Sequence, residues 1–240
     1  MLDFVALDLA DLDAASRTVP YRDTAVGCLL HGFGASANDL IGVAPAIGGA
    51  RRWIFPHAPV PISVAGMTYG RAWFPRETDA LQQALFGSYF QNLRKLEPQG
   101  LPAAATAVRE LLAAREVDWD TLVLGGFSQG AMVTAEILRQ GLENAELPLP
   151  RAAILFSGAL IAERWWTDLD DSADTDRARS VPVFQSHGRS DGILPFEEGR
   201  ALGRALRQAG FTLTAVEFDG GHAIPAEVLH DVARFLDAVI

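Results

Sequence analysis

The fold is decided by residues 121–140, Thr-Leu-Val-Leu-Gly-Gly-Phe-Ser-Gln-Gly-Ala-Met-Val-Thr-Ala-Glu-Ile-Leu-Arg-Gln. Its apolar first part, Thr121–Phe127, is typical of a strand buried on both faces of a parallel sheet. Residues 131–140 predict a helix. Between them, Gly126-Phe127-Ser128-Gln129-Gly130 matches the G-x-S-x-G pattern of a nucleophile elbow, a tight strand-to-helix turn whose glycines leave space for neighbouring backbone. The stretch therefore predicts a serine hydroxyl presented at the beginning of a helix.

The position of Ser128 favours chemistry in which negative charge develops. The free N–H groups and the dipole at a helix N-terminus stabilise such charge. A bare G-x-S-x-G also arises by chance as a glycine-rich connection, and the flanking strand and helix are what favour the functional interpretation. A free hydroxyl is a poor nucleophile at neutral pH, so Ser128 needs a base, and the base needs an orienting carboxylate.

Both partners follow Ser128 in the order that this kind of fold requires, acid first and histidine second. Asp191 comes shortly after the apolar run Val181–Gln185, and His222 comes shortly after Thr212–Phe218. Taken alone, an Asp before Gly is usually a turn residue. Three such residues at the ends of successive strands predict a catalytic triad of Ser128, Asp191 and His222. The other four histidines are interpreted as structural: His31, His57, His187 and His230.

An oxyanion hole is expected from two backbone N–H groups. The first belongs to Gln129, the residue after the nucleophile, and the second to an earlier strand-to-helix loop. His31-Gly32-Phe33-Gly34 follows the apolar run Ala25–Leu30, and its glycines allow the Phe33 N–H to point at a carbonyl oxygen. One such donor contributes about 3 kcal/mol of transition-state stabilisation. A simple glycine turn is the alternative.

Apolar runs alternate with helical patterns along the chain, which predicts an α/β fold with a mostly parallel sheet covered on both faces. The remaining expected strands are Ala25–Leu30, Trp53–Phe55, Ala152–Phe156, Val181–Gln185 and Thr212–Phe218. The remaining expected helices are Ser36–Ile47, Pro102–Arg115, Phe196–Gln208 and Pro225–Ile240. Pro56–Thr78 and the Asp-rich Glu163–Ser180 fit no regular element and are expected to be loops near the site.

Composition narrows the class of protein. With 240 residues, 49% of them hydrophobic, the chain is expected to be one α/β domain spanning residues 1–240. A net charge of -10 argues against a nucleic-acid partner, because such partners require Lys and Arg. Stable membrane insertion is not expected, since no apolar run approaches the roughly 18 residues of a span. A single cysteine, Cys28, and no basic residue before Arg17 favour a cytoplasmic location.

Together these residues resemble the phospholipase/carboxylesterase family, which includes the acyl-protein thioesterases. The similarity covers roughly residues 25–238 and is carried by these blocks: Leu30–Gly34, Pro56–Pro59, Arg71–Phe74, Gly126–Met132, Ser157-Gly158, His187-Gly188 with Asp191, and Gly221-His222. The resemblance implies an α/β-hydrolase fold, the same triad, and Phe33 and Gln129 as oxyanion donors. Two features depart from the family pattern: Pro75 follows Phe74 in place of an acidic residue, and the Asp-rich stretch is longer.

The function expected is hydrolysis of carboxylic esters or thioesters through an acyl-enzyme on Ser128, with a small-molecule or lipid ester as substrate. Lysophospholipids and acylated proteins are alternative substrates. A non-catalytic ligand-binding relative and a structural dimerisation module are the alternatives from other classes. Trp73, Phe74 and Leu160 are candidates for the acyl pocket. No metal or organic cofactor is expected, and a homodimer is left open by the sequence.

Overall fold

The computed structural model describes residues 1–12, 20–64, 67–75, 93–169 and 175–240, and centres on a seven-stranded sheet of order β1-β3-β2-β6-β7-β8-β9. Neighbouring strands are parallel except for β1 and β3, which are antiparallel. The strand bounds are β1 Phe4–Asp8, β2 Tyr21–Leu30, β3 Gly49–Pro56, β6 Leu122–Phe127, β7 Ala152–Phe156, β8 Pro182–Gly188 and β9 Thr212–Phe218. The prediction of a mostly parallel α/β sheet is confirmed.

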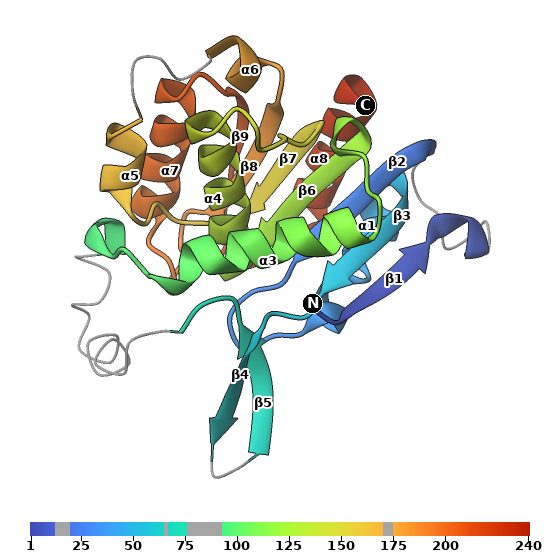
Figure 1. Ribbon diagram of the computed structural model, residues 1–240, viewed down its shortest axis with the longest axis horizontal. Coiled ribbons are helices and arrows are strands. Elements are labelled where there is room, and N and C mark those ends of the chain that lie inside the picture. The colour runs from blue at the N-terminus through green and yellow to red at the C-terminus, as the bar shows by residue number, and fades with distance from the viewer. Residues whose placement is uncertain (13–19, 65–66, 76–92, 170–174) are drawn as a thin grey trace.

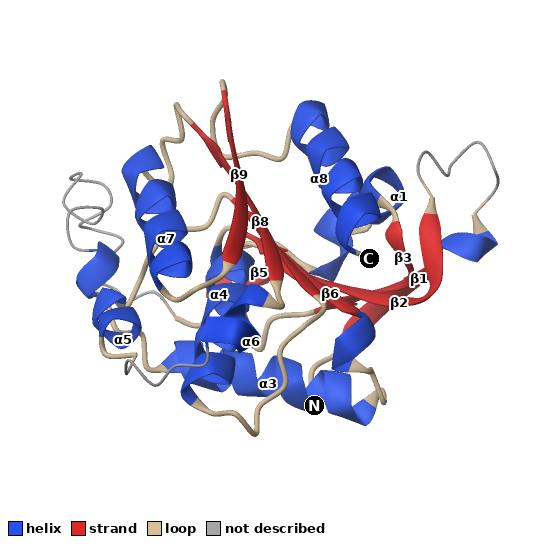
Figure 2. Cartoon of the chain, turned by 90° about the horizontal axis from the view of Figure 1, so that it is seen from above, coloured by secondary structure: helices blue, strands red, loops and turns tan. Residues whose placement is uncertain are grey.

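Two layers of helix enclose the sheet (Figure 2). Helices α1 and α8 cover one face, where the side chains of α8 pack with those of β3 and β7 in one core cluster. Helices α3, α4 and α7 cover the other face. The bounds of these helices are α1 Val43–Ile47, α3 Gly100–Ala114, α4 Gln129–Glu143, α7 Phe196–Gln208 and α8 Ala226–Val239. Burial on both faces explains why the central strands are almost wholly apolar.

All six predicted strands are present in the seven-stranded sheet, and its edge strand β1 was missed. β1 is five residues long, half-buried, and ends in Asp8, which accepts a hydrogen bond from Arg51 Nε at 3.0 Å. A short edge strand with a charged end carries a weak hydrophobic pattern, which explains the omission. The predicted helix Ser36–Ile47 is also divided. A 3-10 turn, Ala37–Leu40, precedes α1, and Ser36 and Asp39 form a capping box at the beginning of that turn.

The prediction of loops at Pro56–Thr78 and Glu163–Ser180 was wrong in part. Strands β4 Val60–Val64 and β5 Met67–Ala72 pair as an antiparallel hairpin that projects from the body of the molecule (Figure 1). The second stretch contains α5 Glu163–Thr167 and α6 Thr175–Arg179. Residues 65–66, 76–78 and 170–174 lie outside the described part. Elements of five or six residues are too short to show a clear periodicity, and Pro61 lowers the strand signal although an edge strand tolerates it.

Cys28 provides a probe of global unfolding. It is the single cysteine of the sequence, lies on central strand β2, and is fully buried, which raises the pKa of its thiol. Because the thiolate is the reactive form, we expect a disulfide reagent such as Ellman's reagent to label the native protein only as fast as it unfolds. Stoichiometric labelling in denaturant is the control. Rapid labelling of the native protein would contradict the burial of this strand.

Candidate active site

Ser128 occupies a sharp turn between β6 and α4. Its backbone angles are φ 56° and ψ −116°, an unfavourable conformation for a residue with a Cβ. The Ser128 N–H donates to Phe156 O at 2.9 Å, and the Met132 N–H donates to Ser128 O at 3.2 Å, so the helix begins directly after the serine. A strained residue of this kind persists only where its surroundings hold it, and such residues cluster at functional sites. The predicted elbow is therefore present as a strand, a turn and a helix.

Close backbone contacts explain the two glycines of the elbow. A Cβ added to Gly126 would lie 2.3 Å from the carbonyl carbon of Gly130. A Cβ added to Gly130 would lie 2.0 Å from Leu30 O, at the end of β2. In both cases the obstacle is backbone, which cannot rotate away as a flexible side chain can. The G-x-S-x-G spacing thus brings the beginning of α4 directly against the ends of β6 and β2.

Replacing Gly130 by alanine is expected to destabilise the protein by about 1–3 kcal/mol, the usual cost of forced overpacking, and to reduce hydrolysis through displacement of Ser128. Urea unfolding and ester hydrolysis measure the two effects. Gly42 is the matched control, because among the described residues no atom beyond its two chain neighbours lies within 4 Å of its added Cβ, and its φ is −68°. Gly42→Ala should leave stability unchanged or slightly raised. Equal stabilities of the two variants would contradict the close approach at Gly130.

Asp191 and His222 form a hydrogen-bonded pair. The His222 Nδ1–H donates to Asp191 Oδ2 at 2.7 Å. The other carboxylate oxygen, Oδ1, accepts the backbone N–H groups of Ile193 and Leu194, each at 2.8 Å. The Asp191 side chain is fully buried, whereas 13% of the His222 side chain is exposed. A ring that donates from Nδ1 is left with an accepting Nε2, which is the nitrogen that a serine nucleophile requires.

Burial alone raises the pKa of Asp191, but the hydrogen bonds from His222 and from the Leu194 and Ile193 N–H groups outweigh it and bring the pKa below 3.8. Because the unfolded chain binds this proton more readily, the ionised carboxylate stabilises the fold above pH 3.8. That stabilisation is lost as the pH falls through the lower pKa of the folded state.

The unfolding free energy of Asp191→Asn is therefore expected to lack part of the decrease that the wild-type protein shows below about pH 4. Urea unfolding at a series of pH values measures it. Asp168→Asn is the control, because 61% of that side chain is exposed and its ion pair with Arg164 lies on the surface. A wild-type acid profile in Asp191→Asn would show that the carboxylate is not held as described.

Phe127 brings His222 to the serine. Its ring centroid lies 4.7 Å from that of His222, and Ser128 is the next residue of the chain. Among the described residues, no hydrogen bond joins Ser128 Oγ to His222 Nε2. Serine-to-base bonds are often long in enzymes without substrate and shorten in the Michaelis complex. The structure thus places all three predicted triad residues at the same end of the sheet and bonds two of them directly.

The predicted oxyanion loop lies beside the serine. A Cβ added to Gly32 would be 3.3 Å from the Cβ of Ser128, so the two segments are in contact. The hairpin holds this loop, because the Gly34 N–H donates to Arg71 O at 2.9 Å. Inside the loop, the His31 Nδ1–H donates to Gly32 O at 2.8 Å, and Nε2 accepts the Ala58 N–H at 3.0 Å. Burial lowers the pKa of His31, which suits this neutral, structural use of the ring.

The Gln129 side chain has a role that the sequence did not reveal. Its Oε1 accepts the Trp73 N–H at 2.8 Å, and its Nε2–H donates to Phe74 O at 2.9 Å. The indole N–H of Trp73 in turn donates to His31 O at 2.8 Å. The residue after the nucleophile therefore connects the elbow to the segment after the hairpin and to the oxyanion loop. No local pattern pointed to this role, because the partners of the side chain are more than 50 positions away.

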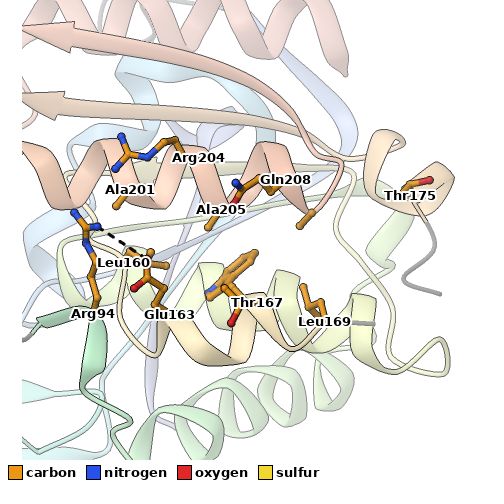
Figure 3. Close-up of a pocket in the computed structure, with 12 residues that line it drawn as sticks. Arg94, Leu160, Glu163, Thr167, Leu169, Thr175, Ala201, Arg204, Ala205 and Gln208 are labelled. Atoms are coloured by element: carbon orange, nitrogen blue, oxygen red, sulfur yellow. Dashed lines mark ion pairs between the residues drawn. The ribbon is translucent and has the colours of Figure 1, made fainter. Parts of the chain in front are cut away.

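The candidate acyl-pocket residues are all buried. Trp73 and Phe74 belong to the core cluster on the α3 side of the sheet. Leu160 lines a pocket of about 490 Å³ between α5 and α7, where Arg94 lies 3.9 Å from Glu163 (Figure 3). Contact of these residues with an acyl group stays a prediction. No helix among the described residues is long and apolar enough to cross a membrane.

A mostly parallel sheet flanked by helices, with a strained serine at a strand-to-helix turn and an Asp–His pair beyond later strands, is the arrangement of the α/β-hydrolases. The family model described as Phospholipase/Carboxylesterase matches residues 20–240, and the chain belongs to this family. It is accordingly a hydrolase of carboxylic esters or thioesters.

Similar proteins agree with this membership. Acyl-protein thioesterase 1 of Gibberella zeae is 30% identical over 229 residues, which cover 90% of each chain. Acyl-protein thioesterase 1 of Eremothecium gossypii is 28% identical and covers 95% of this chain and 93% of its own. Among solved structures, acyl-protein thioesterase 2 of Zea mays has a TM-score of 0.70 at 21% identity and covers 98% of both chains. The Bacillus cereus carboxylesterase has a TM-score of 0.64 at 18% identity and covers 100% of this chain and 95% of its own. Both structures support the fold.

Proposed function

We propose that Ser128, Asp191 and His222 are the catalytic triad of this hydrolase and that the reaction proceeds through an acyl-enzyme on Ser128. The observation that carries the proposal is the 2.7 Å hydrogen bond from His222 Nδ1 to Asp191 Oδ2, made by a ring that packs against the residue before Ser128. That bond selects the tautomer in which Nε2 accepts a proton. The strained backbone of Ser128 at the helix N-terminus supports the same assignment.

In the proposed mechanism, the hydroxyl of Ser128 attacks the acyl carbonyl carbon while its proton passes to His222 Nε2. The negative charge on the carbonyl oxygen is stabilised by the backbone N–H groups of Gln129 and Phe33. When the tetrahedral intermediate collapses, His222 returns the proton to the leaving alcohol or thiol. A water molecule then loses its proton to His222, attacks the acyl-enzyme, and releases the carboxylic acid and free Ser128. Asp191 stabilises the imidazolium in each half of the cycle.

An apolar acyl group fits the surroundings of the site. Phe33 on the oxyanion loop is 36% exposed, and Ile193, two residues after Asp191, is 50% exposed. Solvent-exposed apolar side chains next to the reacting groups favour substrates that cover them. Similarity to acyl-protein thioesterases over most of the chain supports acylated proteins as an alternative substrate class, with lysophospholipids as the other. Small soluble esters remain the main proposal.

A fluorophosphonate probe followed by peptide mass spectrometry tests the site. We expect a single adduct on Ser128, since a serine reacts in this way only when a base and an oxyanion hole activate it. An unlabelled protein would support the non-catalytic alternative, and an adduct on another serine would overturn the assignment. Rates for p-nitrophenyl esters and matching thioesters of increasing acyl length then separate the substrate classes. An optimum at long chains would favour lipid or acyl-protein substrates over small esters.

We also propose that residues 1–240 form one domain and that the protein acts in the cytoplasm. The continuous seven-stranded sheet, built from strands between Phe4 and Phe218, supports the first proposal. The lone, buried Cys28 supports the second, because it has no partner for an intramolecular disulfide. Sedimentation velocity measures the assembly state, and limited proteolysis that yields one protected core tests the single domain.

A further inference from the structure

Asp191 faces a second imidazole. His187 Nε2 lies 3.4 Å from Asp191 Oδ2, the same oxygen that accepts the His222 Nδ1–H. His187 is the second-last residue of β8, and only 4% of its side chain is exposed. The proposed mechanism gives this buried ring no role. Its contact with the Asp191 carboxylate points to a role beside the triad.

The hydrogen bonds around His187 determine which nitrogen carries the proton. Nε2 lies 2.9 Å from Leu194 O, and a carbonyl oxygen can only accept, so Nε2 is the protonated nitrogen. The N–H of the same Leu194 donates to Asp191 Oδ1. Leu194 is therefore held on one side by His187 and holds the carboxylate on the other. This chain of contacts joins the end of β8 to the carboxylate.

We propose that His187 is a positioning residue for Asp191. Its Nε2–H anchors the loop 191–194 to the end of β8 and directs a positive dipole toward Oδ2, which keeps the carboxylate oriented for His222. The inference rests on the proposed triad, because positioning matters for rate only if Asp191 and His222 act in catalysis. Groups that orient catalytic side chains commonly affect rate without contacting the substrate.

The packing around the ring supports a role for its Nε2 side. Gly199 of α7 leaves the space that the ring occupies, since a Cβ there would lie 2.3 Å from His187 Nδ1. Nδ1 is buried and has no hydrogen-bond partner among the described residues. An apolar ring would fill the same space without an unsatisfied nitrogen, which is unfavourable when buried. The polar ring is therefore useful through its other nitrogen, which contacts Leu194 and Asp191.

Several charged groups lie near the His187 ring. Besides Asp191 and His222 on the loops, His187 shares a pocket of about 300 Å³ with Arg200, Arg204 and Arg207 of α7 and Glu217 of β9. Glu217 Oε1 lies 3.7 Å from Arg200 Nε, so these two charges offset one another. The hydrogen bond to Leu194 O requires the proton on Nε2, and this is the form of the ring that positions Asp191.

Two substitutions separate the hydrogen bond from the packing. His187→Phe keeps a planar ring but loses the N–H, and His187→Gln provides an N–H near the position of Nε2. We expect His187→Phe to lower kcat about ten- to hundredfold with little change in KM. The acid limb of its kcat/KM–pH profile should move to higher pH, because Oδ2 without the neighbouring N–H becomes a stronger partner for a protonated His222. His187→Gln should retain most of the wild-type kcat and should leave the acid limb close to its wild-type pH. His230→Gln, on the exposed face of α8, is the control and should behave as wild type.

Wild-type kcat and an unmoved acid limb in folded His187→Phe would overturn the inference, as would equal losses in His187→Gln and His187→Phe. If His187→Phe does not fold, nitrogen-15 NMR of the wild-type protein shows which nitrogen of His187 carries the proton. A neutral His187 protonated on Nε2 supports the inference, and protonation on Nδ1 overturns it. Fluorophosphonate labelling of Ser128 in the wild-type protein tests the proposed function separately. An unlabelled Ser128 would mean that the proposed function fails, whatever the His187 variants show.

Discussion

Replacing Ser128 by alanine is expected to lower kcat for a short p-nitrophenyl ester by about a millionfold, to a level set by the oxyanion hole and binding alone. The methyl group cannot attack a carbonyl, and no acyl-enzyme can form. The rate of spontaneous ester hydrolysis must be subtracted, and the protein preparation must be free of contaminating esterase. Because Ser128 is buried and its change removes one oxygen, thermal stability should remain close to that of the wild-type protein.

Ser180→Ala is the matched control. The Ser180 hydroxyl is exposed and donates to Arg177 O at 2.7 Å. Ser180 lies two residues before β8. Its loss should leave kcat unchanged. If Ser128→Ala retains wild-type turnover, another group is the nucleophile and the proposed triad is wrong.

Replacing His222 by alanine is expected to lower kcat by about the same factor, because triad members act as a unit and removal of either the nucleophile or its base abolishes the shared step. The rate that remains should rise continuously with pH, since hydroxide in solution takes over the role of the missing base. A pH–rate profile with a short p-nitrophenyl ester measures both effects. The double variant Ser128→Ala, His222→Ala should be no slower than either single variant.

His57 offers a control for the base. It is a ring outside the proposed triad, and its Nδ1 accepts the Ala37 N–H at 3.3 Å. His57→Gln keeps an acceptor there and should preserve the pH profile and kcat within a few-fold. A millionfold loss in His57→Gln, or none in His222→Ala, would transfer the role of base away from His222.

The arrangement of the sheet followed from local patterns. Runs such as Ala152–Phe156 are entirely buried, and a strand covered on both faces leaves a continuous apolar signal in the sequence. Helix α7 was predicted with its observed bounds, because its apolar residues recur at helical spacing after Pro195. Short elements of mixed composition escaped prediction. β1 and the β4–β5 hairpin have only five or six residues per strand and no continuous apolar run, and β1 is held by β3, which is distant in the sequence.

The candidate site also contains residues whose roles were predicted from the sequence and residues whose roles were not. Ser128, Asp191 and His222 were predicted because each follows a recognisable strand and because their order is that of the fold. The Gln129 side chain and His187 were not. Gln129 was expected to contribute only its backbone N–H, and His187 was interpreted as one more structural histidine. Their contacts, to Trp73 and to Leu194, depend on how separate loops meet at the ends of the strands.

Local patterns predicted the longer helices and the apolar strands, the serine of the elbow, and the acid and histidine that follow it, because hydrophobic periodicity and turn glycines are local properties of the chain. The folded chain was needed to show that Asp191 Oδ2 accepts the His222 Nδ1–H at 2.7 Å, that His187 holds the same loop, and that the hairpin supports the oxyanion loop. The Asp191–His222 bond joins residues 31 positions apart, and all of these contacts depend on where whole strands and their loops lie in the fold. That placement comes from packing of the complete core, which no local pattern encodes.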